Sequence, residues 1–192
     1  MTPRSVIPRA SLPLVLIILA ASAGPAAAQA RPFHVDANLG RASIDDIDGV
    51  SINESTTAFR LGTGYRFLPW LGVAGGYVDL GNIESTVDIG SGTPQPIKAT
   101  ADGFEITLTG RVPLTDALAL TADAGVLWWT GDTSVAGTAS SDNGNDFTWG
   151  VGAEYAFGPA FVATAGWRRY TLDNVEADAA WLGMMVRFGD AR

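Results

Sequence analysis

The charged residues of this sequence that could take part in chemistry recur at alternate positions within apolar stretches. Glu154 is an example, because it lies in residues 147–157, where every second residue is apolar, most of them large, and the others are small or polar. Side chains alternate across a β-strand, so such charges share the polar face of their strands. The set on this face comprises Asp36, Arg60, Arg66, Glu105, Arg111, Asp123, Glu154, Arg168 and Arg187.

These charges predict ion pairs, because an isolated buried charge costs several kcal/mol. We expect arginine–carboxylate pairs with Glu105 and Glu154 at their centres. Counting residues from the nearest short turn divides the set into two layers. The layer near the short turns would hold Arg66, Arg111, Glu154, Arg187 and Asp36, and the layer near mid-strand would hold Arg60, Glu105, Asp123 and Arg168. Such a network either fills an interior or gates an ion path.

Catalytic and metal-binding residues are not evident. His34 is the only histidine, the chain has no cysteine, and a lone histidine near the start of a strand is more often structural or solvated. Residues 45–54 are acidic but lack the spacing and the helical flanks of a calcium loop, so they are interpreted as a solvated acidic loop. We therefore predict no enzymatic activity, no cofactor and no bound metal.

The N-terminus predicts export. Arg4 and Arg9 precede a short apolar run, and alanines at 26–30 form cleavage-like triplets. The run is too short to span a membrane, so residues 1–30 are interpreted as a signal peptide and 31–192 as the mature domain. Cleavage is expected after Ala30 or after Ala28.

The charge balance argues against nucleic-acid binding. The formal net charge is −8, and Lys98 is the only lysine. Little positive charge is available to neutralise phosphates, so we expect no nucleic-acid partner.

Eight alternating segments and their connections predict the architecture. The long connections are 43–55, 81–100, 131–146 and 172–177, and the short ones are 67–70, 113–116 and 157–160. An even number of antiparallel strands with both chain ends on the short-turn side is typical of bacterial outer-membrane barrels. The predicted fold is all-β, an eight-stranded antiparallel up-and-down transmembrane β-barrel. The predicted strands are 33–39, 57–67, 70–80, 103–112, 118–128, 147–157, 161–167 and 180–188.

The apolar face is expected to contact lipid. A soluble lipocalin-like ligand-binding barrel would turn this face inward, but an eight-stranded barrel is too narrow for so many aromatic rings. The other face is mostly Gly, Ala and Thr, which would make a poorly solvated exterior. The aromatic residues also form two belts of the kind found at membrane interfaces. One belt is Phe33, Phe67, Trp70, Phe157, Phe161 and Phe188 near the short turns, and the other is Tyr77, Trp128, Phe147, Trp149 and Trp167.

Five short segments resemble the OmpA-like small outer-membrane β-barrel family. Residues 62–73, reading GTGYRFLPWLGV, with 77–81, look like the family's second hairpin; 152–155 and 167–170 look like its sixth and seventh strands; 182–188 resembles its C-terminal strand. The resemblance implies a lumen filled by an ionic network and Phe188 as an assembly signal for the barrel assembly machinery. It implies only the barrel, without the peptidoglycan-binding domain of OmpA.

The leading hypothesis is a structural or surface-interaction protein of the bacterial outer membrane with a plugged lumen. A narrow or gated pore and the soluble ligand-binding barrel are the alternatives. The expected partners are outer-membrane lipid and lipopolysaccharide, periplasmic chaperones, and a host or surface ligand at loops 43–55, 81–100 and 131–146. The protein is expected to be a monomer.

Overall fold

A computed structural model describes residues 31–47, 50–87, 95–135, 138–172 and 175–189 of the chain. Every regular element in these residues is a β-strand, so the predicted all-β class is confirmed. The described residues contain no helix that is long and apolar enough to cross a membrane. The strands are β1 (Phe33–Ile47), β2 (Val50–Leu68), β3 (Leu71–Val87), β4 (Gln95–Pro113), β5 (Leu118–Val135), β6 (Thr138–Ala156), β7 (Phe161–Leu172) and β8 (Val175–Phe188).

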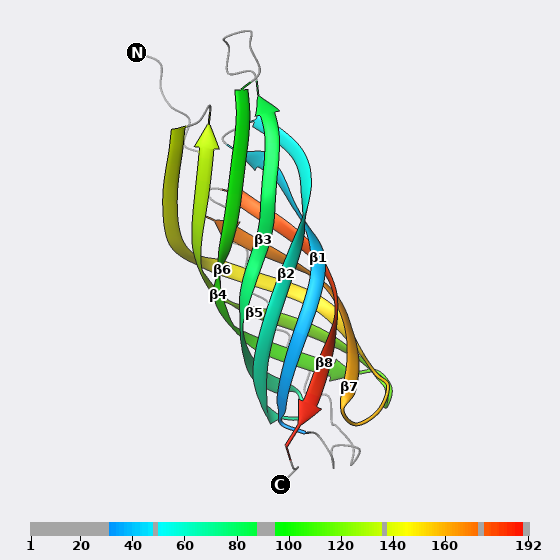
Figure 1. Ribbon diagram of the computed structural model, residues 1–192. Coiled ribbons are helices and arrows are strands. Elements are labelled where there is room, and N and C mark those ends of the chain that lie inside the picture. Colours follow the sequence, from blue (N-terminus) through cyan, green and yellow to red (C-terminus); the bar gives the residue numbers. More distant parts are fainter. Residues whose placement is uncertain (1–30, 48–49, 88–94, 136–137, 173–174, 190–192) are drawn as a thin grey trace, which may run out of the picture.

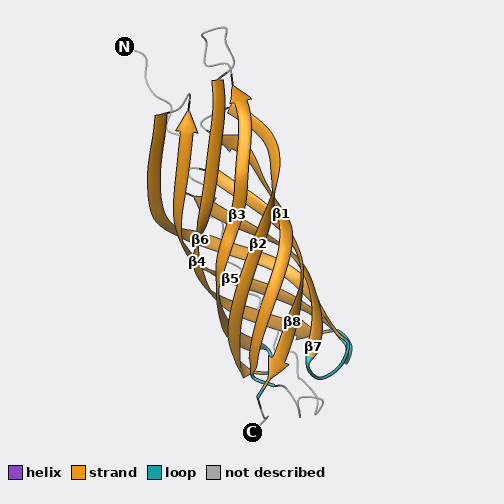
Figure 2. Cartoon of the chain, in the orientation of Figure 1, coloured by secondary structure: helices purple, strands orange, loops and turns teal. Residues whose placement is uncertain are grey.

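The eight strands close into one antiparallel barrel in which each strand pairs with its sequence neighbours (Figures 1 and 2). Closure is made by β1 and β8, which pair from Phe33 with Phe188 to Ile44 with Ala177. Three tight turns join β2 to β3, β4 to β5 and β6 to β7 at one end, which we call the short-turn end. The C-terminal end of β8 lies there too, as the predicted topology requires.

The apolar face of each strand points outward. Leu182 is 70% exposed, Leu39 is 67% exposed and Leu61 is 60% exposed, although all three lie in the middle of their strands. A soluble barrel would bury these side chains, so the lipocalin-like alternative is wrong. In water, each exposed leucine would forgo roughly 1.5–3 kcal/mol of burial energy. The exterior therefore suits a lipid environment.

The predicted bounds of the long loops are wrong, because the loops are shorter than predicted and the strands are longer. Most of 43–55, 81–100 and 131–146 continues the strands, as β1 runs to Ile47, β3 to Val87 and β5 to Val135. The same holds for 172–177, because β7 runs to Leu172 and β8 begins at Val175. Both faces of these extensions carry polar residues, so apolar–polar alternation disappears although the backbone remains extended. The acidic segment 45–54 is likewise mostly strand, and its side chains lie outside the described part.

Four strands rise above the closed ring. Pairing of β2 with β3 ends at Phe59 and Asp79, and pairing of β6 with β7 ends at Thr148 and Tyr170. Beyond these points β3, β4, β5 and β6 continue together as a four-stranded sheet, which we call the wall (Figure 1).

Gly81 lies where β3 separates from β2. Its φ is +83°, a conformation that favours glycine, and its N–H donates to the Asp79 carboxylate at 2.7 Å. The register between β3 and β4 also shifts between Asp79 and Asn82. This bulge turns β3 away from the ring and into the wall.

Candidate functional site in the barrel lumen

The lumen contains a buried salt-bridge network, and Glu105 of β4 is at the centre of its middle layer. Glu105 is 1% exposed, and its Oε1 accepts a hydrogen bond from Arg60 Nε at 2.6 Å. The same oxygen accepts from the Arg168 guanidinium, which reaches across the lumen from β7. One carboxylate thus joins two arginines from strands on opposite sides of Glu105.

Two further carboxylates complete this layer. Arg168 also donates to Asp123 Oδ1 of β5 at 2.5 Å, and Arg60 also pairs with Asp36 of β1. Asn38 donates to Asp36 Oδ2 at 2.7 Å. Asp36 therefore belongs to the middle layer and not to the layer near the short turns, where residue counting put it, because the strands are strongly tilted. The two arginines and three carboxylates leave a formal charge of −1 in this layer.

A second layer surrounds Glu154 of β6 at the short-turn end. Arg111 Nε donates to Glu154 Oε2 at 3.0 Å, the Arg187 guanidinium donates to the same oxygen, and Arg66 lies 3.5 Å from Oε1. All four side chains keep at most 15% of their surface exposed. Three guanidiniums against one carboxylate leave a formal charge of +2 in this layer.

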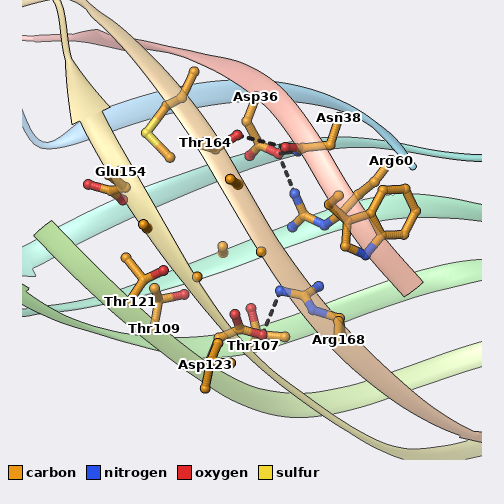
Figure 3. Close-up of a pocket in the computed structure, with 18 of the residues that line it drawn as sticks. Asp36, Asn38, Arg60, Thr107, Thr109, Thr121, Asp123, Glu154, Thr164 and Arg168 are labelled. Carbon is orange, nitrogen blue, oxygen red and sulfur yellow. Dashed lines mark hydrogen bonds and ion pairs between the residues drawn. The ribbon is translucent and has the colours of Figure 1, made fainter. Parts of the chain in front are cut away.

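A cavity of about 120 Å³, lined by charged, hydroxyl and apolar side chains, lies between the two layers. Glu154 lies toward one end of it and Arg60 and Arg168 toward the other, with Thr109 and Thr121 between them (Figure 3). Thr164 of β7 also lines it and donates to Asn38 Oδ1 at 2.8 Å. A cavity of this size, with charged and hydroxyl groups on its lining, has room for a few ordered waters.

The lumen above the middle layer is apolar, which the sequence analysis did not anticipate. Tyr170 is fully buried there, and Trp181 and Trp129 are 8% and 9% exposed. Trp129 donates its indole N–H to Asp146 Oδ2 at 2.7 Å. The packed cluster, which we call the apolar half of the lumen, consists of Ala42, Ala58, Val78, Leu80, Leu127, Trp129, Tyr170, Leu172, Ala177, Ala179 and Trp181.

A signal for this apolar half was present in the sequence. Tyr170 is two residues from Arg168, and Trp181 is two residues from Gly183, so both fall on the inward face. Small residues opposite them provide the space, since Gly40 pairs directly with Trp181. A large inward residue that lies opposite a glycine on the neighbouring strand is the pattern that predicts an apolar filling of the lumen.

The other predicted residues are on the outer surface or at the short-turn end. His34 lies at the short-turn end, close enough to Arg66, Glu154 and Arg187 to interact with them electrostatically. Phe188 ends β8 and stacks on Phe33 at 5.9 Å, but its role as an assembly signal stays a prediction. The contact of the aromatic belts with membrane interfaces also stays a prediction. The exposed belt residues are Phe33, Phe67, Trp70, Phe157, Phe161 and Phe188 near the short turns, and Trp128, Phe147 and Trp149 toward the wall.

Tyr77 and Trp167 also lie on the outer surface toward the wall. Tyr77 packs against Phe104 at 5.3 Å between ring centroids, and Trp167 packs against Trp149 at 5.0 Å. Arg169 lies over the Trp167 ring at 5.4 Å and makes a two-pronged contact with Asp178, at 2.7 and 2.8 Å. This cluster forms part of the outer surface near the base of the wall.

The outer face of the wall changes from aromatic to polar in successive rows. Phe104 pairs with Trp128, and the next outward row along β4 and β5 pairs Asp102 with Thr130. Above it, Asn82, Thr100, Asp132 and Ser141 are direct cross-strand neighbours on four successive strands. These residues, with Lys98 and its neighbours, line a hollow of about 350 Å³. The wall therefore presents a hydrophilic surface directly above the aromatic belt.

The family comparison matches the barrel. A model described as "Outer membrane protein beta-barrel domain" matches residues 14–188 of the chain. No curated protein sequence shows significant similarity to it.

Solved structures share the fold at low sequence identity. Ail, the attachment invasion locus protein of Yersinia pestis, was solved with the heparin analogue sucrose octasulfate; it is 19% identical, has a TM-score of 0.58, and the match covers 82% of this chain and 99% of Ail. Neisserial surface protein A is 18% identical with a TM-score of 0.57, covering 81% and 97% of the two chains. OprG from Pseudomonas aeruginosa is 14% identical with a TM-score of 0.58, covering 83% and 97%.

Proposed function

The chain belongs to the outer membrane protein β-barrel family, and on this premise we propose that it is a surface-interaction protein whose contact surface is the wall. It resides in the bacterial outer membrane. The observation that carries the proposal is the continuation of β3, β4, β5 and β6 beyond the closed ring. Loops and hairpins held by a rigid scaffold are where binding residues concentrate, and the ring supplies that scaffold. The predicted contact regions 81–100 and 131–146 lie largely in the wall.

The charge of the wall defines the kind of partner. Asp79, Asp102 and Asp132 line its outer face or base, while Lys98 is its only described lysine. Ail carries the heparin analogue in its structure, but an acidic surface repels such polyanions. We therefore propose a neutral or basic partner, such as a hydroxyl-rich or cationic surface component.

A hairpin-shortening experiment tests this role. Residues 83–97 are replaced by a two-residue turn, and cells producing each protein are applied to immobilised extracellular-matrix components of known charge. We expect the wild type to bind neutral or basic components and not heparin, and the shortened variant to lose that binding. Gly158→Ala is the matched control, because an added Cβ meets nothing within 4 Å at this short turn. Unchanged binding by the shortened variant would reject the tip of the β3–β4 hairpin, residues 83–97, as the contact surface.

We further propose that the lumen does not conduct ions. The two ionic layers and the apolar half occupy it in succession, so no continuous wide path remains. The alternative, a gated pore, is favoured by the cavity of about 120 Å³ between the layers. Wild type and Glu154→Ala are compared in planar bilayers: identical, negligible conductance rejects a gate at Glu154, whereas a large increase supports one.

The remaining partners are also proposals. We propose that the chain is a monomer without enzymatic activity, and that periplasmic chaperones and the barrel assembly machinery recognise it through Phe188. Lipid contact at the aromatic belts and lipopolysaccharide contact near the wall follow from the outward apolar face. Phe188→Ala should slow assembly in cells while leaving refolding in detergent nearly unchanged, since only the first process uses the machinery.

A further inference from the structure

The layer around Glu154 has more positive charge than its own residues neutralise. Among the described residues, Glu154 is the only carboxylate within ion-pair distance of Arg66, Arg111 or Arg187. The middle layer differs, because its carboxylates outnumber its arginines. The excess of positive charge is therefore confined to the layer at the short-turn end.

The donors of this layer are also incompletely used. Each guanidinium carries five N–H donors, whereas one carboxylate has about four acceptor sites. Arg187 Nε is buried and has no hydrogen-bond partner within the described part of the chain. Among the described residues, the Arg66 guanidinium makes one ion pair, at 3.5 Å from Glu154 Oε1, which is too long for a good hydrogen bond. Several donors are left for a ligand or for water.

The surroundings add positive charge and restrict access. Arg31 donates to the Arg187 carbonyl at 3.3 Å, which brings a fourth guanidinium to the same end of the barrel. The Glu154 layer is within a few residues of the short turns, as Arg66 pairs with Gly72 and Ala119 pairs with Glu154. The middle layer and the apolar half block the lumen above, so a ligand enters only from the short-turn end, which faces the periplasm.

We infer that Arg66, Arg111 and Arg187 form a binding site for a small inorganic oxyanion of the phosphate type. Guanidiniums present paired N–H donors that match the oxygens of phosphate, and charge-assisted hydrogen bonds of this kind are strong. The anion neutralises the excess charge and accepts from the unused donors. Glu154 holds the three arginines in place and competes with the anion, so it lowers affinity.

The test is titration of the full-length mature protein, folded in a non-ionic detergent, with inorganic phosphate at constant ionic strength. Isothermal calorimetry or ³¹P NMR line broadening reports binding. We expect saturable binding that weakens about tenfold or more in Arg111→Gln, the ratio expected from losing one charged hydrogen bond. Glu154→Gln should bind about tenfold more tightly. Heat-modifiable gel mobility verifies the fold of each variant.

Controls separate the site from general surface charge. Arg41 is exposed on β1, outside the lumen, so Arg41→Gln should leave phosphate binding unchanged. If Arg111→Gln fails to fold, the gain in Glu154→Gln still tests the site. Absence of saturable binding in both wild type and Glu154→Gln overturns the inference, as does an equal loss in Arg41→Gln. Loss of phosphate binding on transfer to phosphatidylglycerol bilayers would assign the site to lipid headgroups and overturn the inorganic ligand.

Discussion

The two halves of the lumen fill the same narrow space by different physical means. Toward the short turns, arginines and carboxylates from β1, β2, β4, β5, β6, β7 and β8 meet in two ionic layers. Toward the wall, Tyr170, Trp129 and Trp181 pack with aliphatic and alanine side chains. Both halves fill the lumen with side chains, but only the ionic half depends on specific charged partners.

This difference predicts how each half fails. A buried ion pair that loses one partner leaves an uncompensated charge, which is more costly than the pair was favourable. An apolar cluster that loses a side chain leaves a cavity, and its cost depends on how far the neighbours collapse. The ionic half should therefore respond to the identity of a residue, and the apolar half to its volume.

Glu105→Ala should have the largest effect. Arg60 and Arg168 each keep one carboxylate, Asp36 and Asp123, but both guanidiniums lose the buried acceptor that they share, so the free energy of unfolding should fall by about 3–5 kcal/mol. Urea unfolding in detergent, followed by tryptophan fluorescence, measures the change. Glu105→Gln keeps the volume and one acceptor, so it should lose less; equal losses would mean that volume, not charge, matters here.

Trp181→Ala should cost about 3 kcal/mol, because it removes a large side chain that is 8% exposed. Trp181→Phe retains most of the volume and should recover most of that loss in the same unfolding assay.

In planar bilayers each single variant, Glu105→Ala or Trp181→Ala, should remain non-conducting, since the other half still fills the lumen. Conductance should rise in the double variant, and a conducting single variant would contradict closure by two independent halves.

Gly40→Val tests the packing of the apolar half by adding volume, whereas Trp181→Ala removes it. A Cβ on Gly40 would lie 2.7 Å from Trp181 Cε3 and 2.2 Å from the Ala180 carbonyl oxygen, so the substitution overpacks this position. A loss of about 1–3 kcal/mol is expected in urea unfolding. Gly40→Val combined with Trp181→Phe should recover part of it; no recovery would place the clash on the backbone alone.

Arg169→Gln should have the smallest effect on the free energy of unfolding. It removes an ion pair on the outer surface, which can be compared with the ion pairs of the lumen. Arg169 binds Asp178 and Glu176 on the outer surface, where solvent screens the charges. The loss should be about 1 kcal/mol or less, and added salt should shrink it. The loss in Glu105→Ala should change little with salt. A salt-independent loss at Arg169 would show that this exterior cluster is also screened from solvent.

Much of the fold was predictable because alternation is a local property of the chain. The face of Glu154 or Leu182 follows from its position in the strand, and short turns with Pro and Gly fixed the antiparallel order. The wall was not predictable in this way. Its strands carry polar residues such as Ser141 and Asn82 on both faces, and such a stretch of sequence resembles a loop. Their extended conformation comes from cross-strand pairing with neighbours distant in sequence.

Which residues face inward follows from the order of residues alone, since a side-chain period of two assigns each residue to one face of its strand. Which inward residues meet depends on how the eight strands are tilted and paired. Because the strands are tilted, Asp36 lies beside Arg60 in the middle layer and not in the layer that residue counting suggested. Closure of the barrel places Arg168 of β7 against Glu105 of β4. Height along a barrel depends on tilt and register, which arise from pairing all eight strands at once. The excess charge around Glu154 is likewise a property of the closed barrel, because Arg66, Arg111 and Arg187 come from three separate strands.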